Sequence, residues 1–127
     1  MFIRRSITDV LMRRAKNSRC LLLTGPRQVG KSTLLKHNYP GVKYYTFDDQ
    51  VLLASATEDP KLFLKNIPKP SILDEVQYAK DLFPYIKIEC DKDERYENYY
   101  LTGSQQMKLM AKAKESLAGR VSILELQ

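Results

Sequence analysis

The residues from Gly25 to Ser32 have the types and spacing of a loop that binds phosphate groups. They match the pattern G-x-x-x-x-G-K-S/T, which ends in Lys31 and Ser32. In such a loop the backbone N–H groups point at the phosphates, the lysine ammonium neutralises their charge, and the final hydroxyl binds magnesium. A glycine turn that happens to precede a lysine is the structural alternative. We expect these residues to contact a phosphate-bearing ligand: Gly25, Pro26, Arg27, Gln28, Val29, Gly30, Lys31, Ser32 and Thr33.

Two acidic residues, Asp74 and Glu75, follow the short run Ser71 to Leu73. Open parallel sheets bind their ligands at the carboxyl ends of their strands, so this position suits a reactive site. We expect Asp74 to hold magnesium, and Glu75 to orient and deprotonate an attacking water molecule. A helix N-cap is the ordinary alternative for Asp74. Beside a phosphate loop, the acidic pair indicates hydrolysis of a nucleoside triphosphate.

Three further polar residues follow predicted strands. Thr102 and Ser104 stand where Tyr100 to Gln105 ends a strand, and their hydroxyls could hydrogen-bond the γ-phosphate or its attacking water. A strand that turns through Gly103, with Ser104 capping the next helix, fits the same residues. Gln77 follows the acidic pair and could couple the γ-phosphate to the next helix.

The order of the motifs favours ATP over GTP. A predicted strand, Val42 to Phe47, falls between the phosphate loop and Asp74. It predicts an additional strand between the two motif strands in the sheet, as in P-loop enzymes with a catalytic glutamate, whereas kinases and GTPases have these strands adjacent. The chain also has no Asn-Lys-x-Asp motif for reading guanine. We therefore expect ATP and Mg²⁺ as the ligands.

These residues require strands that end beside one another. Apolar runs bounded by Gly, Pro, Asn or Asp predict strands over Cys20 to Thr24, Val42 to Phe47, Ser71 to Asp74, Asn98 to Thr102 and Val121 to Leu126. Predicted helices cover Lys31 to Asn38, Val51 to Thr57, Lys61 to Asn66, Leu82 to Cys90 and Gln105 to Lys114. A first helix is predicted to begin at Ser6, because Ser6 and Asp9 resemble a capping box. The pattern predicts a three-layer α/β P-loop sandwich with about five parallel strands in the order 5-1-4-3-2.

The chain resembles a prokaryotic family of AAA-type ATPases. The segments that carry the resemblance are Gly25 to Ser32, Leu73 to Ala79, Phe83 to Lys87, Leu101 to Gln106 and Glu115 to Val121. The resemblance implies that residues 1–127 are an ATPase core without the C-terminal lid and output domain that usually follow in this family. It also implies that Arg120 completes the site of a neighbouring subunit, giving self-association. A surface arginine before an edge strand is the alternative for Arg120.

Composition limits the remaining functions. A chain of 127 residues has room for one domain, and its longest apolar runs are too short to span a membrane, which indicates a cytoplasmic protein. Cys20 and Cys90 lack a C-x-x-C spacing and are expected to be reduced and buried. The net charge of +6 suits nucleic acid, although solvated helix faces give similar charge runs. Besides an ATPase, we therefore consider an ATP-dependent switch with little turnover and a basic nucleic-acid-binding protein.

Overall fold

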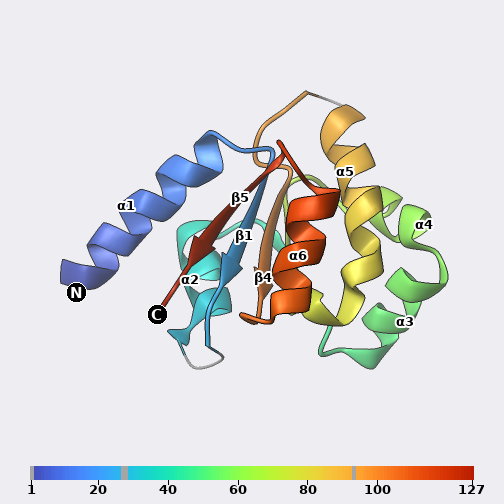
Figure 1. Ribbon diagram of the computed structural model, residues 1–127, viewed down its shortest axis with the longest axis horizontal. Coiled ribbons are helices and arrows are strands. Elements are labelled where there is room, and N and C mark those ends of the chain that lie inside the picture. Colours follow the sequence, from blue (N-terminus) through green and yellow to red (C-terminus); the bar gives the residue numbers. More distant parts are fainter. Residues whose placement is uncertain (1, 27–28, 93) are drawn as a thin grey trace.

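A single parallel sheet of five strands forms the centre of the computed structural model, which describes residues 2–26, 29–92 and 94–127. The strands are β1 (Cys20–Thr24), β2 (Lys43–Thr46), β3 (Ser71–Asp74), β4 (Tyr99–Gly103) and β5 (Val121–Glu125). Their spatial order is β2-β3-β4-β1-β5, so the predicted order 5-1-4-3-2 is confirmed. The carboxyl ends of all five strands therefore meet at one edge of the sheet (Figure 1).

Burial separates the central strands from the edges. Every residue of β1, β3 and β4 is buried, which explains why these segments contain few charged side chains. The edge strands β2 and β5 are only partly buried. Successive residues alternate between the two faces: Leu22 packs into one core cluster, while Leu21 and Leu23 pack into the other.

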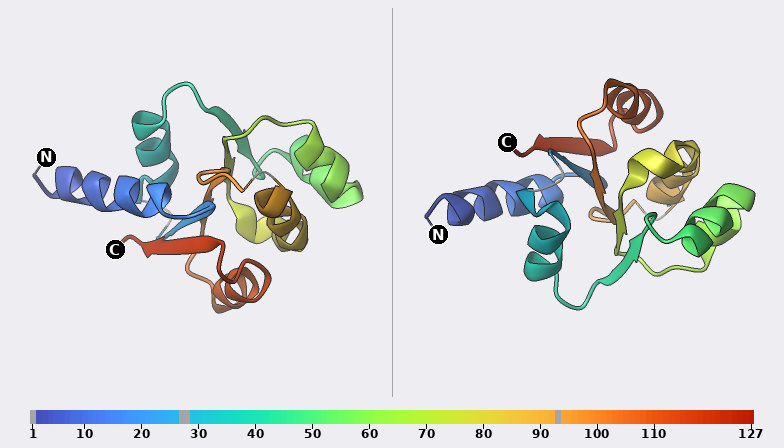
Figure 2. Two further views of the ribbon diagram at one scale, coloured as in Figure 1. Left: turned by 90° about the horizontal axis from the view of Figure 1, so that it is seen from above. Right: turned by 90° about the horizontal axis from the view of Figure 1, so that it is seen from below.

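Helices cover both faces of the sheet and complete a three-layer fold, as predicted (Figure 2). On one face lie α1 (Phe2–Lys16) and α2 (Lys31–Asn38), which bury Leu11, Ala15 and Leu35. The other face carries most of the remaining apolar side chains. It is covered by α3 (Gln50–Glu58), α4 (Pro60–Lys65), the 3₁₀ helix η2 (Val76–Leu82), α5 (Phe83–Lys92) and α6 (Met107–Ser116).

One predicted element boundary is wrong. The first helix begins at Phe2, not at Ser6, because nothing from Phe2 to Arg5 breaks a helix and Ser6 therefore lies inside it. The structure also contains a helix that was not predicted: Glu75 has left-handed backbone angles, and η2 then runs directly into α5. The other predicted elements are present, with ends displaced by at most two residues.

The prediction for the two cysteines can be checked in the fold. Cys20 and Cys90 are both fully buried free thiols, as expected. At the start of α3, Asp49 accepts hydrogen bonds from the backbone N–H groups of Val51 and Leu52 and so caps this helix. In the part of the chain that the structure describes, no helix is long and apolar enough to cross a membrane.

Candidate functional site

The phosphate loop leaves the carboxyl end of β1 through a glycine that no other residue could replace without a shift. A Cβ atom on Gly25 would lie 2.7 Å from the backbone oxygen of Leu126, and the φ angle of Gly25 is +155°. Gly30, at φ 76°, precedes α2 as its N-cap residue. Pro26 is exposed, and Val29 packs against the core cluster beneath α2. The predicted contacts of Arg27 and Gln28 lie outside the described residues.

Lys31 is buried at the start of α2, with 5% of its surface exposed. Its ammonium donates hydrogen bonds to the carbonyl oxygens of Gly25 and Pro26, both at 2.9 Å. The loop thus folds around its own lysine. Beyond it, Ser32 is partly buried and Thr33 is exposed on the first turn of α2.

Asp74, the last residue of β3, is buried and accepts hydrogen bonds on both carboxylate oxygens. The Tyr44 hydroxyl donates to Oδ2 at 2.7 Å, and the Thr102 hydroxyl donates to Oδ1 at 2.5 Å. Burial raises the pKa of Tyr44, and the hydrogen bond to the Asp74 carboxylate raises it further. Tyr44 therefore stays a hydroxyl donor at any physiological pH. Tyr44 belongs to no sequence motif, and it reaches Asp74 through the pairing of β2 with β3.

Thr102 connects the two acidic residues. It is fully buried, and its hydroxyl accepts a hydrogen bond from the Glu75 backbone N–H at 3.0 Å while donating to Asp74. Glu75 has left-handed angles, φ 61° and ψ 49°. A non-glycine residue in this region is uncommon and marks a constrained backbone. We predicted that the Thr102 hydroxyl hydrogen-bonds the γ-phosphate or its attacking water. In the structure this hydroxyl has two partners within the protein, Glu75 and Asp74.

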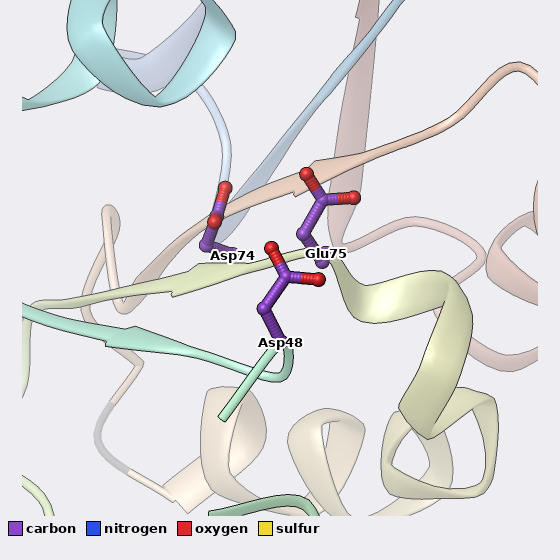
Figure 3. A group of neighbouring side chains, drawn as sticks. All are labelled: Asp48, Asp74 and Glu75. Carbon is purple, nitrogen blue, oxygen red and sulfur yellow. The ribbon is translucent and has the colours of Figure 1, made fainter. Parts of the chain in front are cut away.

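A third carboxylate joins this acidic pair. Carboxylate oxygens of Asp48, Asp74 and Glu75 all lie within 4.8 Å of one another at the ends of β2 and β3 (Figure 3). Like charges this close repel, and a divalent cation relieves the repulsion. The donor set consists of oxygen atoms, which Mg²⁺ prefers. Asp48 was not predicted as a site residue. Two adjacent aspartates after a strand that pairs with β3 could have indicated a further metal ligand.

A cavity of about 240 Å³ is lined by residues of the phosphate loop, of the acidic turn and of the segment after β4. Lys31 and Glu75 both line this cavity. The side-chain amide of Gln77 donates to Glu75 Oε1 at 2.6 Å and accepts from the Ser104 backbone N–H at 3.2 Å. The cavity is lined by Gly25, Pro26, Lys31, Glu75, Gln77, Tyr78, Ser104, Gln105 and Gln106.

Arg120 lies at the opposite end of the sheet from these residues. It directly precedes β5, whose first residue pairs with Cys20 at the amino end of β1, whereas Gly25 follows the carboxyl end. Its guanidinium pairs with Asp91 and donates to the Ala118 carbonyl. Arg120 also lines a separate cavity of about 510 Å³ between α1 and β5. The structure therefore does not bring Arg120 together with the predicted site residues of its own chain.

Comparison with known proteins gives consistent matches. A family model described as an AAA domain matches residues 17–127. The uncharacterized proteins Mb2031c of Mycobacterium bovis and Rv2008c of Mycobacterium tuberculosis are each 36% identical over 128 residues. These matches cover 99% of this chain but only 29% of each relative. A solved structure of a DNA replication initiation factor matches with a TM-score of 0.55 at 16% identity, covering 97% of this chain and 45% of that one.

Proposed function

The chain belongs to the AAA domain family, and from this premise we propose that it binds ATP with Mg²⁺ and hydrolyses the γ-phosphate. The observation that carries the proposal is the cavity of about 240 Å³, whose lining includes both buried Lys31 and Glu75, a member of the acidic group. A triphosphate brings negative charge to the lysine, and its metal ion brings positive charge to the carboxylates. The lysine therefore suits the triphosphate, and the carboxylates suit the metal ion that the triphosphate carries.

Binding would begin at the phosphate loop. Lys31 donates to two neutral carbonyl groups, and its ammonium is attracted more strongly by the negative charge of phosphate oxygens. We expect the ammonium to exchange one set of partners for the other when ATP binds. The backbone N–H groups from Arg27 to Thr33, together with the N-terminus of α2, would surround the phosphates. Arg27 and Gln28 belong to this proposed contact set.

Hydrolysis would depend on the acidic residues. Glu75 accepts a proton from water as the water oxygen forms a bond to the γ-phosphorus. The bond from the γ-phosphorus to the bridging oxygen breaks, giving ADP and inorganic phosphate. Ser32, Asp74 and Asp48 would hold Mg²⁺, which neutralises charge on the phosphate oxygens. Thr102 fixes the acidic pair through its two hydrogen bonds.

An ATP-dependent switch with little turnover is the second candidate. No arginine among the described residues lines the cavity, so in an isolated chain the described residues offer only Lys31 as a cation at the γ-phosphate. Rapid turnover would then need Arg120 of a second copy, which we propose as the self-associating partner. We also propose a cytoplasmic location, because ATP is abundant there and the two thiols suit a reducing compartment.

Nucleic-acid binding is the third candidate, and one observation favours it. Among the residues that the structure describes, the arginines Arg13, Arg14 and Arg120 line the cavity of about 510 Å³ beside β5, and no acidic residue does. Phosphate contacts release counterions, so DNA affinity that falls steeply with salt would support this function. The likeness to the replication initiation factor gives the fold alone.

Calorimetry and a phosphate-release assay test the proposal. Lys31→Met keeps the aliphatic stem without the ammonium, and we expect it to lose ATP binding. Lys61→Met makes the same change at an exposed position of α4 and serves as the matched control. Glu75→Gln should keep ATP binding and lose turnover. Equal ATP affinity in wild type and Lys31→Met would reject the site, while binding without turnover in the wild type would favour the switch.

A further inference from the structure

The side chain of Gln77 joins two parts of the site that are far apart in sequence. Its Nε2 atom donates to Glu75 Oε1 at 2.6 Å, and its Oε1 atom accepts from the Ser104 N–H at 3.2 Å. The partners fix the orientation of the amide, because a carboxylate can only accept and a backbone N–H can only donate. Gln77 is 9% exposed, so water cannot readily replace either hydrogen bond.

Gly103 lies close to the Gln77 amide and to the Leu109 side chain of α6. A Cβ atom on Gly103 would lie 3.5 Å from Gln77 Oε1 and 2.5 Å from the Leu109 side chain. Glycine at this position therefore allows Gln77 and α6 to approach the turn together. Gln77, Glu75 and Ser104 all line the cavity that contains Lys31. The amide thus connects the acidic turn after β3 with the turn after β4, inside the proposed reaction site.

We propose that Gln77 is a positioning residue for hydrolysis, which holds the Glu75 carboxylate through Oε1 and ties that orientation to the Ser104 turn before α6. The inference rests on the proposed function, since Glu75 is the base only if the chain hydrolyses ATP. With Oε1 engaged, Oε2 is the oxygen left to accept the proton of the attacking water. A charge-assisted hydrogen bond of 2.6 Å restricts rotation of the carboxylate, and orientation of this kind raises the rate of proton transfer.

Only a side-chain amide with the length of glutamine can form both hydrogen bonds of the bridge between Glu75 and Ser104. The bridge needs one donor for Glu75 and one acceptor for Ser104 on a single uncharged side chain. A glutamate offers acceptors alone, and a lysine offers donors alone. Methionine matches the shape but makes neither hydrogen bond. Substitutions of Gln77 can therefore remove both contacts, or one of them, with little change in volume.

The first test separates turnover from binding. For Gln77→Met we expect kcat to fall by about 10-fold to 100-fold, which is part of the roughly 10²-fold to 10⁴-fold that general-base catalysis supplies, and the KM for ATP to change by less than about twofold. Gln50→Met makes the same change at an exposed glutamine and should leave both unchanged. In a Glu75→Gln background, Gln77→Met should cause no further loss. An unchanged kcat, or a rise in KM alone, would overturn the proposal.

The second test separates the two ends of the amide. Gln77→Glu keeps an acceptor for Ser104 but places a second carboxylate against Glu75. Repulsion makes one of two neighbouring carboxylates hold its proton to higher pH, so the acid limb of the kcat profile should move up by about one pH unit or more. A shift of this limb reports the contact between residue 77 and Glu75, whereas the loss of kcat in Gln77→Met reports that the contact serves turnover. An acid limb in the same place would contradict the contact with Glu75.

Hydrogen exchange distinguishes failure of this inference from failure of the proposed function. The Ser104 amide should exchange faster in Gln77→Met than in wild type without any nucleotide, and it should keep the wild-type rate in Gln77→Glu. Unchanged exchange in Gln77→Met would overturn the bridge even in an active ATPase. Faster exchange in Gln77→Met, together with a wild type that never hydrolyses ATP, would keep the bridge but overturn the proposed function, and with it the catalytic use of Gln77.

Discussion

The guanidinium of Arg120 forms a bidentate ion pair with the Asp91 carboxylate, with both N–O distances at 2.9 Å. The pair joins the start of β5 to the end of α5. Hydrogen bonds from Arg120 hold the pKa of Asp91 below its usual range, and the carboxylate raises the pKa of Arg120 in return. If Arg120 acts on a neighbouring copy, it must first leave this partner.

Removing the Asp91 carboxylate should therefore make it easier for Arg120 to act on a neighbouring copy. In Asp91→Asn we expect hydrolysis per chain to rise at high protein concentration, because the freed guanidinium can reach a neighbour's γ-phosphate. Arg120→Ala should lower activity strongly, since such an arginine contributes roughly 10³ to 10⁵ in rate in related sites. Mixing Arg120→Ala with Lys31→Ala should restore some phosphate release. Activity that is independent of concentration and unaffected by Arg120→Ala would exclude the trans role.

Tyr44→Phe should weaken the response to magnesium. The substitution leaves Asp74 Oδ2 without its donor at 2.7 Å, so the carboxylate loses part of its fixed orientation. Partners of metal ligands commonly contribute about 10-fold to 100-fold in affinity, and we expect the half-saturating Mg²⁺ concentration to rise by about 10-fold. ATP binding measured in EDTA should not change. Tyr45→Phe, on the other face of β2, is the matched control.

Asp48→Asn should weaken the stabilisation that magnesium contributes. The Asp48 carboxylate lies within 4.8 Å of those of Asp74 and Glu75, so the substitution removes one charged oxygen ligand from the proposed cation site. The rise in melting temperature that Mg²⁺-ATP provides should therefore shrink. Glu58→Gln, an exposed acid at the end of α3, controls for net charge. A larger Mg²⁺-ATP shift in Asp48→Asn would show that Asp48 is not a ligand.

Glu89 should make stability depend on acid pH. Burial opposes the shift, but hydrogen bonds from Lys92 and Lys69 bring the pKa of Glu89 below its ordinary 4.5. A lowered folded pKa means that the stabilisation is present above pH 4.5 and is lost as pH falls through the folded value. Urea unfolding should show this slope in wild type and a flatter one in Glu89→Gln. At pH 7 the variant should be less stable by about 1 to 3 kcal/mol.

The sequence predicted the architecture because its signals were local. The phosphate loop and the acids after Leu73 each mark the end of a strand, and the order of these strands fixed the topology. The start of α1 was wrong because a serine with a nearby acid also occurs inside helices. A capping pattern alone does not show whether the preceding residues continue the helix.

The contacts within the site were harder to predict. Tyr44 and Asp48 reach the acidic pair only through pairing of β2 with β3, which brings together residues that are distant in sequence. The two partners of the Thr102 hydroxyl likewise depend on how β3 and β4 align. Motifs along the chain identify which residues belong to a site. Which of them form hydrogen bonds across strands depends on the register of the sheet, which the motifs do not show.

The contact between Gly25 and Leu126 also has a mechanical consequence. The Leu126 N–H donates to the Thr24 carbonyl at 2.7 Å, and its oxygen faces Gly25 too closely for any Cβ. Tension applied to the end of β5 would thus be transmitted by backbone contact to the phosphate loop, with no flexible side chain to absorb it. We expect a pulling force at Gln127, applied in an optical trap, to shorten the lifetime of bound ATP more than the same force applied at the other edge of the sheet, at Lys43. A force at the end of β5 would then change the affinity of the loop for ATP, and ATP binding at the loop would in turn change the force that the end of β5 exerts.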